Sequence, residues 1–158
     1  MIGYSQYMRR SFILALLLVG CSAPHDHDHP PTSTTPQSGH HHHHPAPHGG
    51  QLIEIGEEFA HLEALWKPES GELRIYVLDG EAQRGVPLVQ PSIRLQVGQQ
   101  SYELPAQSNA LSGEKPGNSS EFAAQLSELK NRKAWTGEVE MIEVKGQKFP
   151  RLKLEISP

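Results

Sequence analysis

The stretch Glu72-Leu73-Arg74-Ile75-Tyr76-Val77-Leu78 decides the fold of this chain. Polar and apolar side chains alternate along it with a period of two, and it contains β-branched and aromatic residues, as is typical of a half-buried strand. The turn sequence Glu69-Ser70-Gly71 precedes it, and Asp79-Gly80 follows it. The pattern therefore predicts a short strand between two turns.

Further short strands are predicted on both sides of this stretch. They are expected at 51–55, 58–66, 86–89, 92–97, 101–104 and 120–124, with a hairpin of 137–144 and 148–156 around Gly146. Residues 105–119 are predicted to be a polar loop, and 126–133 a helical turn. Short strands with frequent turns favour an all-β fold, a single antiparallel, immunoglobulin-like β-sandwich of about seven strands.

The composition limits the classes of protein that remain. The 158 residues suffice for about one domain. With 14 basic and 18 acidic residues the net charge is −4, which does not favour binding to nucleic acid. A single cysteine excludes an intramolecular disulfide, and ten histidines are an unusual surplus.

The lone cysteine, Cys21, follows a signal sequence. Met8-Arg9-Arg10 is a basic start, and the apolar run 12–19 is too short to span a bilayer, so 1–20 is predicted to be a signal peptide that begins best at Met8. Leu18-Val19-Gly20-Cys21 resembles a bacterial lipobox. The resemblance implies cleavage before Cys21 and acylation of Cys21, which would anchor the protein in a membrane. The alternative is a plain secretory signal that leaves Cys21 as a free thiol.

The lipobox also indicates where the protein resides. A lipoprotein of this kind lies at the periplasmic face of the cell envelope. Ser22 follows the cysteine in place of the aspartate that retains lipoproteins in the inner membrane of enteric bacteria, so we expect the outer membrane.

Residues 21–47 are predicted to be a disordered tether between the lipid and a β-sandwich domain at 48–158. Residues 22–47 contain no aliphatic residue larger than alanine and carry six prolines. Such a segment cannot bury enough apolar area to offset the entropy lost on ordering. Proline stiffens it into a spacer.

The tether holds eight of the ten histidines. They form two clusters, His25, His27 and His29, which alternate with aspartates, and His40, His41, His42, His43 and His44. Neutral imidazole binds divalent transition metals, and carboxylates add oxygen ligands. We expect these histidines to bind Zn, Ni, Co or Cu(II) with low specificity. An affinity tag, a solubilising linker and a pH-responsive brush are alternatives.

The start of the predicted domain carries a second motif. His48-Gly49-Gly50 is followed by a strand, by His61-Leu62-Glu63, and by a strand that ends in Tyr76-Val77-Leu78-Asp79. This order resembles the HGG-containing periplasmic domain associated with cobalt-zinc-cadmium efflux adaptors, and stand-alone lipoproteins that carry the same block. The resemblance covers about residues 48–90 and implies a metal-efflux complex as a partner.

His48, His61 and Glu63 are therefore candidate metal ligands in the domain. Residues two apart on a strand face the same side, so His61 and Glu63 are expected to lie together, and a hairpin would bring His48 near them. These three residues leave room for water or for tether imidazoles. The alternative is that the histidines are ordinary surface residues and that the glycines permit a tight turn.

No sequence motif indicates catalysis. A glycine-rich phosphate loop, G-x-S-x-G and H-E-x-x-H are all absent from the sequence. We therefore expect no enzyme, but a lipid-anchored periplasmic protein that binds or buffers divalent metal ions, accessory to metal efflux. The alternative is a protein-interaction module held off the membrane by a spacer.

Overall fold

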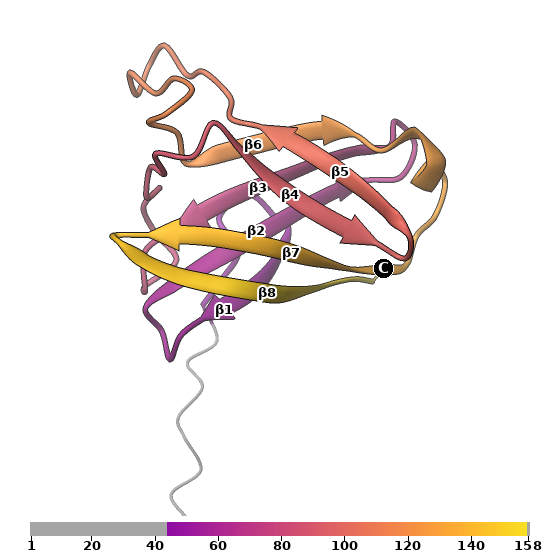
Figure 1. Ribbon diagram of the computed structural model, residues 1–158, viewed down its shortest axis with the longest axis horizontal. Coiled ribbons are helices and arrows are strands. Elements are labelled where there is room, and N and C mark those ends of the chain that lie inside the picture. Colours follow the sequence, from indigo (N-terminus) through magenta and orange to yellow (C-terminus); the bar gives the residue numbers. More distant parts are fainter. Residues whose placement is uncertain (1–43, 158) are drawn as a thin grey trace, which may run out of the picture. The chain divides into compact units, whose positions relative to one another are not determined.

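The computed structural model describes residues 44–157 (Figure 1). The predicted signal peptide, Cys21 and the tether histidines from His25 to His43 lie outside the described residues. Between residues 44 and 157, no helix is both long and apolar enough to cross a lipid bilayer.

Two four-stranded antiparallel sheets pack face to face, which confirms the predicted antiparallel β-sandwich. The strands are β1 (Gln51–Ile55), β2 (Ala60–Lys67), β3 (Glu72–Leu78), β4 (Ser92–Val97), β5 (Gln100–Pro105), β6 (Glu121–Gln125), β7 (Trp135–Val144) and β8 (Gln147–Ile156). The first sheet has the order β1-β2-β3-β6 and the second β5-β4-β7-β8. This order differs from the A-B-E-D and C-F-G sheets of immunoglobulin constant domains.

Alternation along each strand builds the core between the sheets. On β3, Leu73, Ile75 and Val77 are buried in the core, while Arg74 and Tyr76 take the opposite face. β6 is the neighbour of β3, and its Phe122, paired with Ile75, is fully buried. The same alternation on β2 sends Leu62 inward, so its neighbours His61 and Glu63 must lie on the outer face.

Three segments differ from the sequence prediction. The predicted strand at 86–89 is absent: Pro87 has no N–H to donate, and only Leu88 forms an isolated bridge, with Ser119. The strand expected at 58–66 begins only at Ala60, because residues 56–59 form a turn closed by the N–H of Phe59. The helical turn expected at 126–133 is a single 3₁₀ turn, η1 (Ser127–Leu129).

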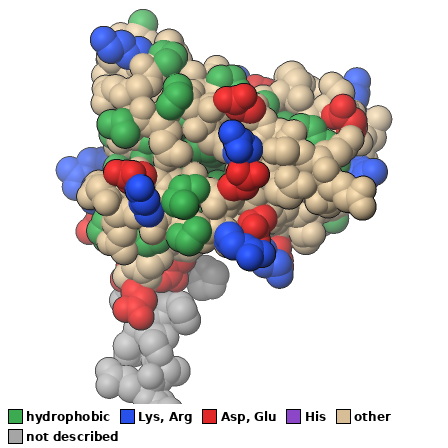
Figure 2. Space-filling view, viewed as in Figure 1, with side chains coloured by type: hydrophobic (Ala, Val, Ile, Leu, Met, Phe, Trp, Pro, Cys, Tyr) green, Lys and Arg blue, Asp and Glu red, His purple; other side chains and the backbone are tan. Residues whose placement is uncertain are grey.

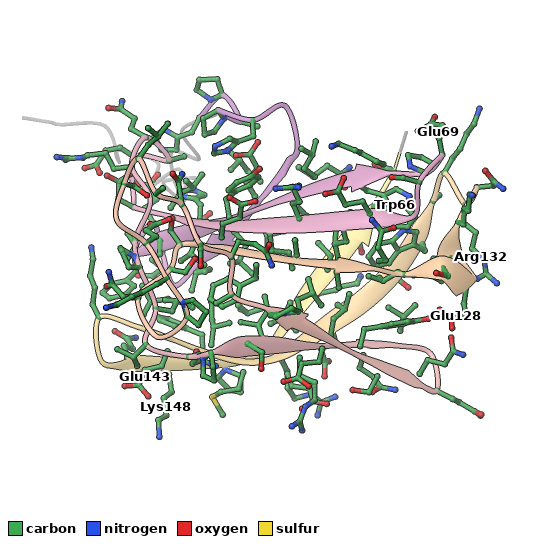
Figure 3. The ribbon with its side chains drawn as sticks, turned by 90° about the horizontal axis from the view of Figure 1, so that it is seen from above. Trp66, Glu69, Glu128, Arg132, Glu143 and Lys148 are labelled. Atoms are coloured by element: carbon green, nitrogen blue, oxygen red, sulfur yellow. The ribbon has the colours of Figure 1, made fainter. Side chains whose placement is uncertain are left out.

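The two ends of the sandwich are distinguished by their side chains (Figure 3). At one end, the indole nitrogen of Trp66 donates to the carbonyl of Arg132 at 2.8 Å, and the Trp66 ring meets that of Trp135 edge to face. At the other end, Glu143 and Lys148 are register partners in the β7–β8 hairpin.

The outer face of the second sheet carries ordinary surface charges. Figure 2 shows basic and acidic side chains lying next to one another on this face. The ion pairs of this sheet include Arg94 with Glu140 at 3.4 Å and Arg151 with Glu138 at 3.2 Å. None of the described histidines is visible there. Exposed pairs of this kind contribute little stability. The candidate site lies instead on the outer face of the first sheet.

Two leucine-to-alanine substitutions test the packing. Leu104 on β5 is fully buried, whereas Leu111 in the 105–119 loop is fully exposed. We expect Leu104→Ala to lower the free energy of unfolding by about 2–5 kcal/mol, because it leaves a cavity in the core. Leu111→Ala should change it by less than about 0.5 kcal/mol. Urea denaturation of both variants provides the measurement, and equal effects would contradict the assigned core.

Candidate functional site

His61 and Glu63 lie next to each other on the outer face of the first sheet, as the spacing predicts. In β2, His61 is paired with Glu54 of β1 and Leu78 of β3, and Glu63 with Tyr76 of β3. An outer face is usually solvated, yet the exposed fraction is 5% for His61 and 0% for Glu63. The segment 44–50 contacts both residues and shields them from solvent.

Glu63 holds the HGG motif in place. One carboxylate oxygen accepts the backbone N–H of His48 at 2.8 Å and that of Gly50 at 2.9 Å. The other oxygen is 2.6 Å from Nδ1 of His48. A buried carboxylate is tolerated only when it is well paired, and these three contacts satisfy it. We call residues 48–50 with Glu63 the HGG latch.

Both glycines of the latch have a steric or conformational role. A Cβ atom on Gly50 would lie 2.5 Å from the carbonyl oxygen of Ala64, so the backbone can approach β2 only without a side chain. Gly49 has a φ of +77°, in the left-handed region that glycine adopts at little cost. The HGG motif is thus explained by backbone geometry at this point.

The His48 imidazole is oriented by two contacts. Its Nδ1 faces the carboxylate of Glu63, and its ring stacks on Tyr76 with the ring centroids 3.7 Å apart and the planes 9° from parallel. The side chain is still 39% exposed. Because a carboxylate holds Nδ1, Nε2 is the ring nitrogen left to act as a ligand, as in carboxylate–histidine–metal arrangements.

His61 is oriented by a backbone carbonyl. Its Nδ1 lies 3.2 Å from the carbonyl oxygen of Asp79, which can only accept, so Nδ1 carries the proton. The Asp79 carboxylate organises the turn after β3 by accepting the backbone N–H groups of Gln83 and Arg84. These bonds, that of Gln83 foremost, hold the pKa of Asp79 below its ordinary value of 3.8 although burial opposes the shift.

His44, the last residue of the second tether cluster, lies beside His61. The two ring centroids are 5.3 Å apart, and the rings meet edge to face at 74°. The structure therefore brings together His44 with His61, and His48 with Glu63. Within residues 44–157, no three or more His, Cys, Asp or Glu side chains are grouped so that they could hold a metal ion.

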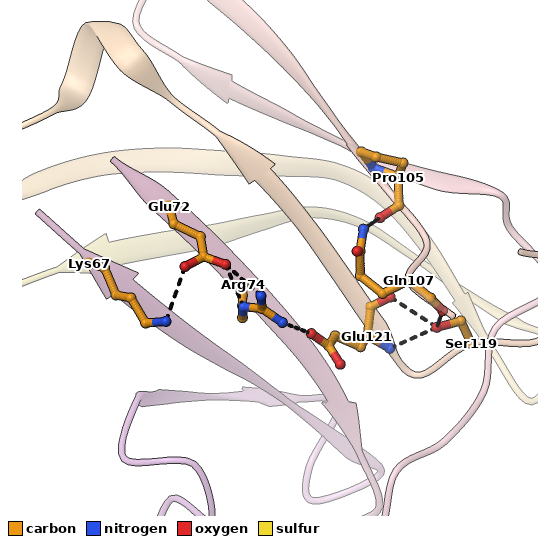
Figure 4. Close-up of polar contacts among 7 residues, drawn as sticks. All are labelled: Lys67, Glu72, Arg74, Pro105, Gln107, Ser119 and Glu121. Atoms are coloured by element: carbon orange, nitrogen blue, oxygen red, sulfur yellow. Dashed lines mark hydrogen bonds and ion pairs between the residues drawn. The ribbon is translucent and has the colours of Figure 1, made fainter. Parts of the chain in front are cut away.

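A chain of ion pairs crosses the same face (Figure 4). Lys67 contacts Glu72 at 3.1 Å, Glu72 contacts Arg74 at 2.6 Å, and Arg74 binds Glu121. The hydrogen bond from Lys67, then that from Arg74, lowers the pKa of Glu72, and burial followed by the charge of Glu121 raises that of Tyr76. Tyr76 therefore stays neutral beside His48.

A polar groove of about 520 Å³ opens at His48. Its lining includes His48, Tyr76, Glu114 and Glu121. Glu114 is fixed there, because one of its carboxylate oxygens accepts the hydroxyl of Ser120 at 2.7 Å. The exposed His48 ring thus borders a groove that contains two carboxylates, of which Glu121 is already paired with Arg74.

Sequence reasoning did not single out Asp79, Tyr76 or Glu54 as parts of this site. Asp79 could have been recognised from its Asp-Gly turn, which marks a carboxylate that accepts backbone N–H groups. Tyr76 and Glu54 are placed by strand register, which no local motif reveals.

Comparison with known proteins identifies no relative: no family model matches the chain, and no curated protein or solved structure shows significant similarity to it.

The latch is tested by Glu63→Gln. A glutamine side chain replaces the charge-assisted bonds of the buried carboxylate with weaker neutral ones, and its N–H₂ group can face Nδ1 of His48 only if the imidazole changes tautomer. We expect the free energy of unfolding to fall by about 1–3 kcal/mol in urea denaturation. Glu69→Gln, at an exposed turn, is the matched control and should have little effect. Equal stability of both variants would contradict the latch.

The lowered pKa of Asp79 predicts that the stability of the fold depends on pH. Its pKa is lower in the folded protein than in the unfolded chain, so its stabilisation is complete above about pH 4 and is lost as the pH falls through the folded value. Asp79→Asn removes this titration, so the stability of the variant should decline less between about pH 4 and pH 2. Thermal unfolding across this range measures the two slopes, and identical slopes would refute the assignment.

Proposed function

We propose that this protein is a lipid-anchored protein of the periplasmic face that captures divalent transition-metal ions. The tether histidines would increase the number of metal ions bound, and the imidazoles of the domain would supply ligands in fixed positions. Support comes from the two histidine clusters, from the lipobox at Cys21 and from the HGG–HLE block with its resemblance to periplasmic domains of metal efflux. The proposal includes delivery to an efflux complex.

One observation carries this proposal: both histidines of the domain have Nδ1 held by an oxygen acceptor. Glu63 holds that of His48, and the carbonyl of Asp79 holds that of His61. Metal-ligating histidines almost always donate their second ring N–H in this way, to a carboxylate or a carbonyl. The arrangement fixes the tautomer and leaves Nε2 as the metal-binding atom.

Glu63 would then support the metal ligand His48 without binding the ion. Both of its oxygens are engaged by the latch and its side chain is fully buried, so it is better placed to orient His48 than to bind an ion directly. A carboxylate in this position raises the basicity of the imidazole and so strengthens its bond to a metal.

A second candidate function, the interaction module, is favoured by a different observation. Leu111 is fully exposed, and Val89 has an exposed fraction of 73%. Exposed apolar side chains of this kind are found at protein–protein contacts, although single ones are common on monomers. If this function is correct, capture of an envelope partner should require Leu111 and be indifferent to a chelator.

Calorimetric titration of Zn(II), Ni(II) and Cu(II) into the chain from Ser22 to Pro158 tests metal capture. We expect binding with dissociation constants well below about 1 mM, because neutral imidazoles bind these ions strongly. Replacing His25, His27, His29 and His40 to His43 with serine should reduce the number of ions bound while the fold, followed by circular dichroism, is kept. Absence of binding by the unsubstituted chain would end the proposal.

A further inference from the structure

We infer that a cleft between β1 and β8, at the end of the sandwich that carries Trp66 and Trp135, binds a small carboxylate with an apolar body. This inference goes beyond metal capture and does not depend on it. Three observations carry it: an apolar hollow, one cation at its rim without a partner, and a buried indole N–H without an acceptor.

The cleft exists because the two sheets are bonded to each other along one side only. On the side of β5 and β6, the backbone N–H of Gln107 donates to the carbonyl of Glu121 at 2.8 Å. On the side of β1 and β8, the described strands form no β-bridge, and the Gln51 side chain donates to the hydroxyl of Ser157 at 2.6 Å. Two hollows, of about 420 and 840 Å³, share Gln51, Ile156 and Ser157, and we call them together the β1–β8 cleft. A ligand that parts the contact of Gln51 with Ser157 would reach both hollows.

The smaller hollow combines an apolar lining with a single charge. Its apolar lining residues are Ala64, Leu65, Trp66, Pro68 and Ile156. Lys133 is the only charged residue that lines it, and within residues 44–157 this lysine forms no ion pair. In the larger hollow, Lys153 and Glu155 pair with each other. The cleft thus has the size of a small-molecule site and one unmatched positive charge, which favours a ligand with one anionic group.

The chain before Lys133 is fixed against the smaller hollow. The backbone N–H of Asn131 donates to the carbonyl of Pro68 at 2.8 Å, and the carbonyl of Arg132 accepts the indole N–H of Trp66 at 2.8 Å. Pro68 and Trp66 both line the hollow, so the backbone that leads to Lys133 is held in place. The ammonium group can therefore pair with a carboxylate at little cost in backbone entropy.

Trp135 supplies a second donor for the carboxylate. It lines the larger hollow, and its ring meets that of Trp66 edge to face with the centroids 5.4 Å apart. Its Nε1 is buried and has no hydrogen-bond partner among the described residues. Buried donors are seldom left unpaired, because an unmade hydrogen bond is costly. In the complex, one carboxylate oxygen accepts this N–H and the other faces Lys133.

Titration with octanoate tests the site. The protein runs from Ser22 to Pro158, and a chelator is present so that metal bound to histidines does not contribute. The chain has two tryptophans, so a ¹⁵N–¹H spectrum shows two indole signals, and Trp66→Phe identifies that of Trp135. We expect a dissociation constant of about 1 mM or lower. The Trp135 signal should move downfield as its N–H gains an acceptor, and the Trp66 signal should move less.

Variants and related probes separate the charge from the apolar body. Lys133→Gln should weaken octanoate binding about three- to tenfold. Lys130→Gln, the same change of charge at an exposed residue that does not line the cleft, should have little effect. Octanol, which lacks the charge, and acetate, which lacks the apolar body, should both bind more weakly than octanoate.

Three results would overturn the site. They are the absence of saturable octanoate binding, equal effects of the Lys133 and Lys130 substitutions, and binding that leaves the Trp135 signal in place, which would assign its N–H to a buried water. The comparison of the two lysines does not require Trp66→Phe to fold. Because metal is excluded throughout, failure of this site would leave metal capture to be decided by its own titration.

Discussion

The buried carboxylate of Glu63 is the constraint on which the described N-terminal segment depends. A charge removed from water is costly unless hydrogen bonds replace those it loses. Here every replacement comes from residues 48–50, which supply two backbone N–H groups and one imidazole. The segment must therefore cross the outer face of the first sheet, and it could not leave without exposing or stranding the carboxylate.

This constraint makes one outer face of the sandwich different from the other. The second sheet carries exposed charge pairs, such as Arg94 with Glu140. The first sheet carries buried polar groups, whose partners are specified by geometry, and His61 is the clearest case. Buried polar groups specify one arrangement because every alternative leaves a donor or acceptor unpaired. The fixed orientations of the His48 and His61 imidazoles follow from the burial of the polar groups on this sheet.

The sequence predicts the strands well where a regular alternation lies between turns. The ranges 51–55, 72–78 and 92–97 agree with β1, β3 and β4 to the residue. The prediction fails at 86–89, where an apolar run suggests a strand, but Pro87 removes a donor and Leu88 alone forms a β-bridge. The period-two alternation describes only the side chains, whereas a strand also requires hydrogen-bond partners for its backbone.

The candidate site was predictable only in part, for a related reason. The spacing of His61 and Glu63 correctly places them on one face. The hairpin does not explain the proximity of His48, because its register pairs Gln51 with Ala64 and would carry residue 48 away from Glu63; the turn at 46–49 brings His48 back. Whether a carboxylate binds a metal or orients a histidine depends on which N–H groups reach it, and spacing does not specify this. Glu54 is near His61 through register alone.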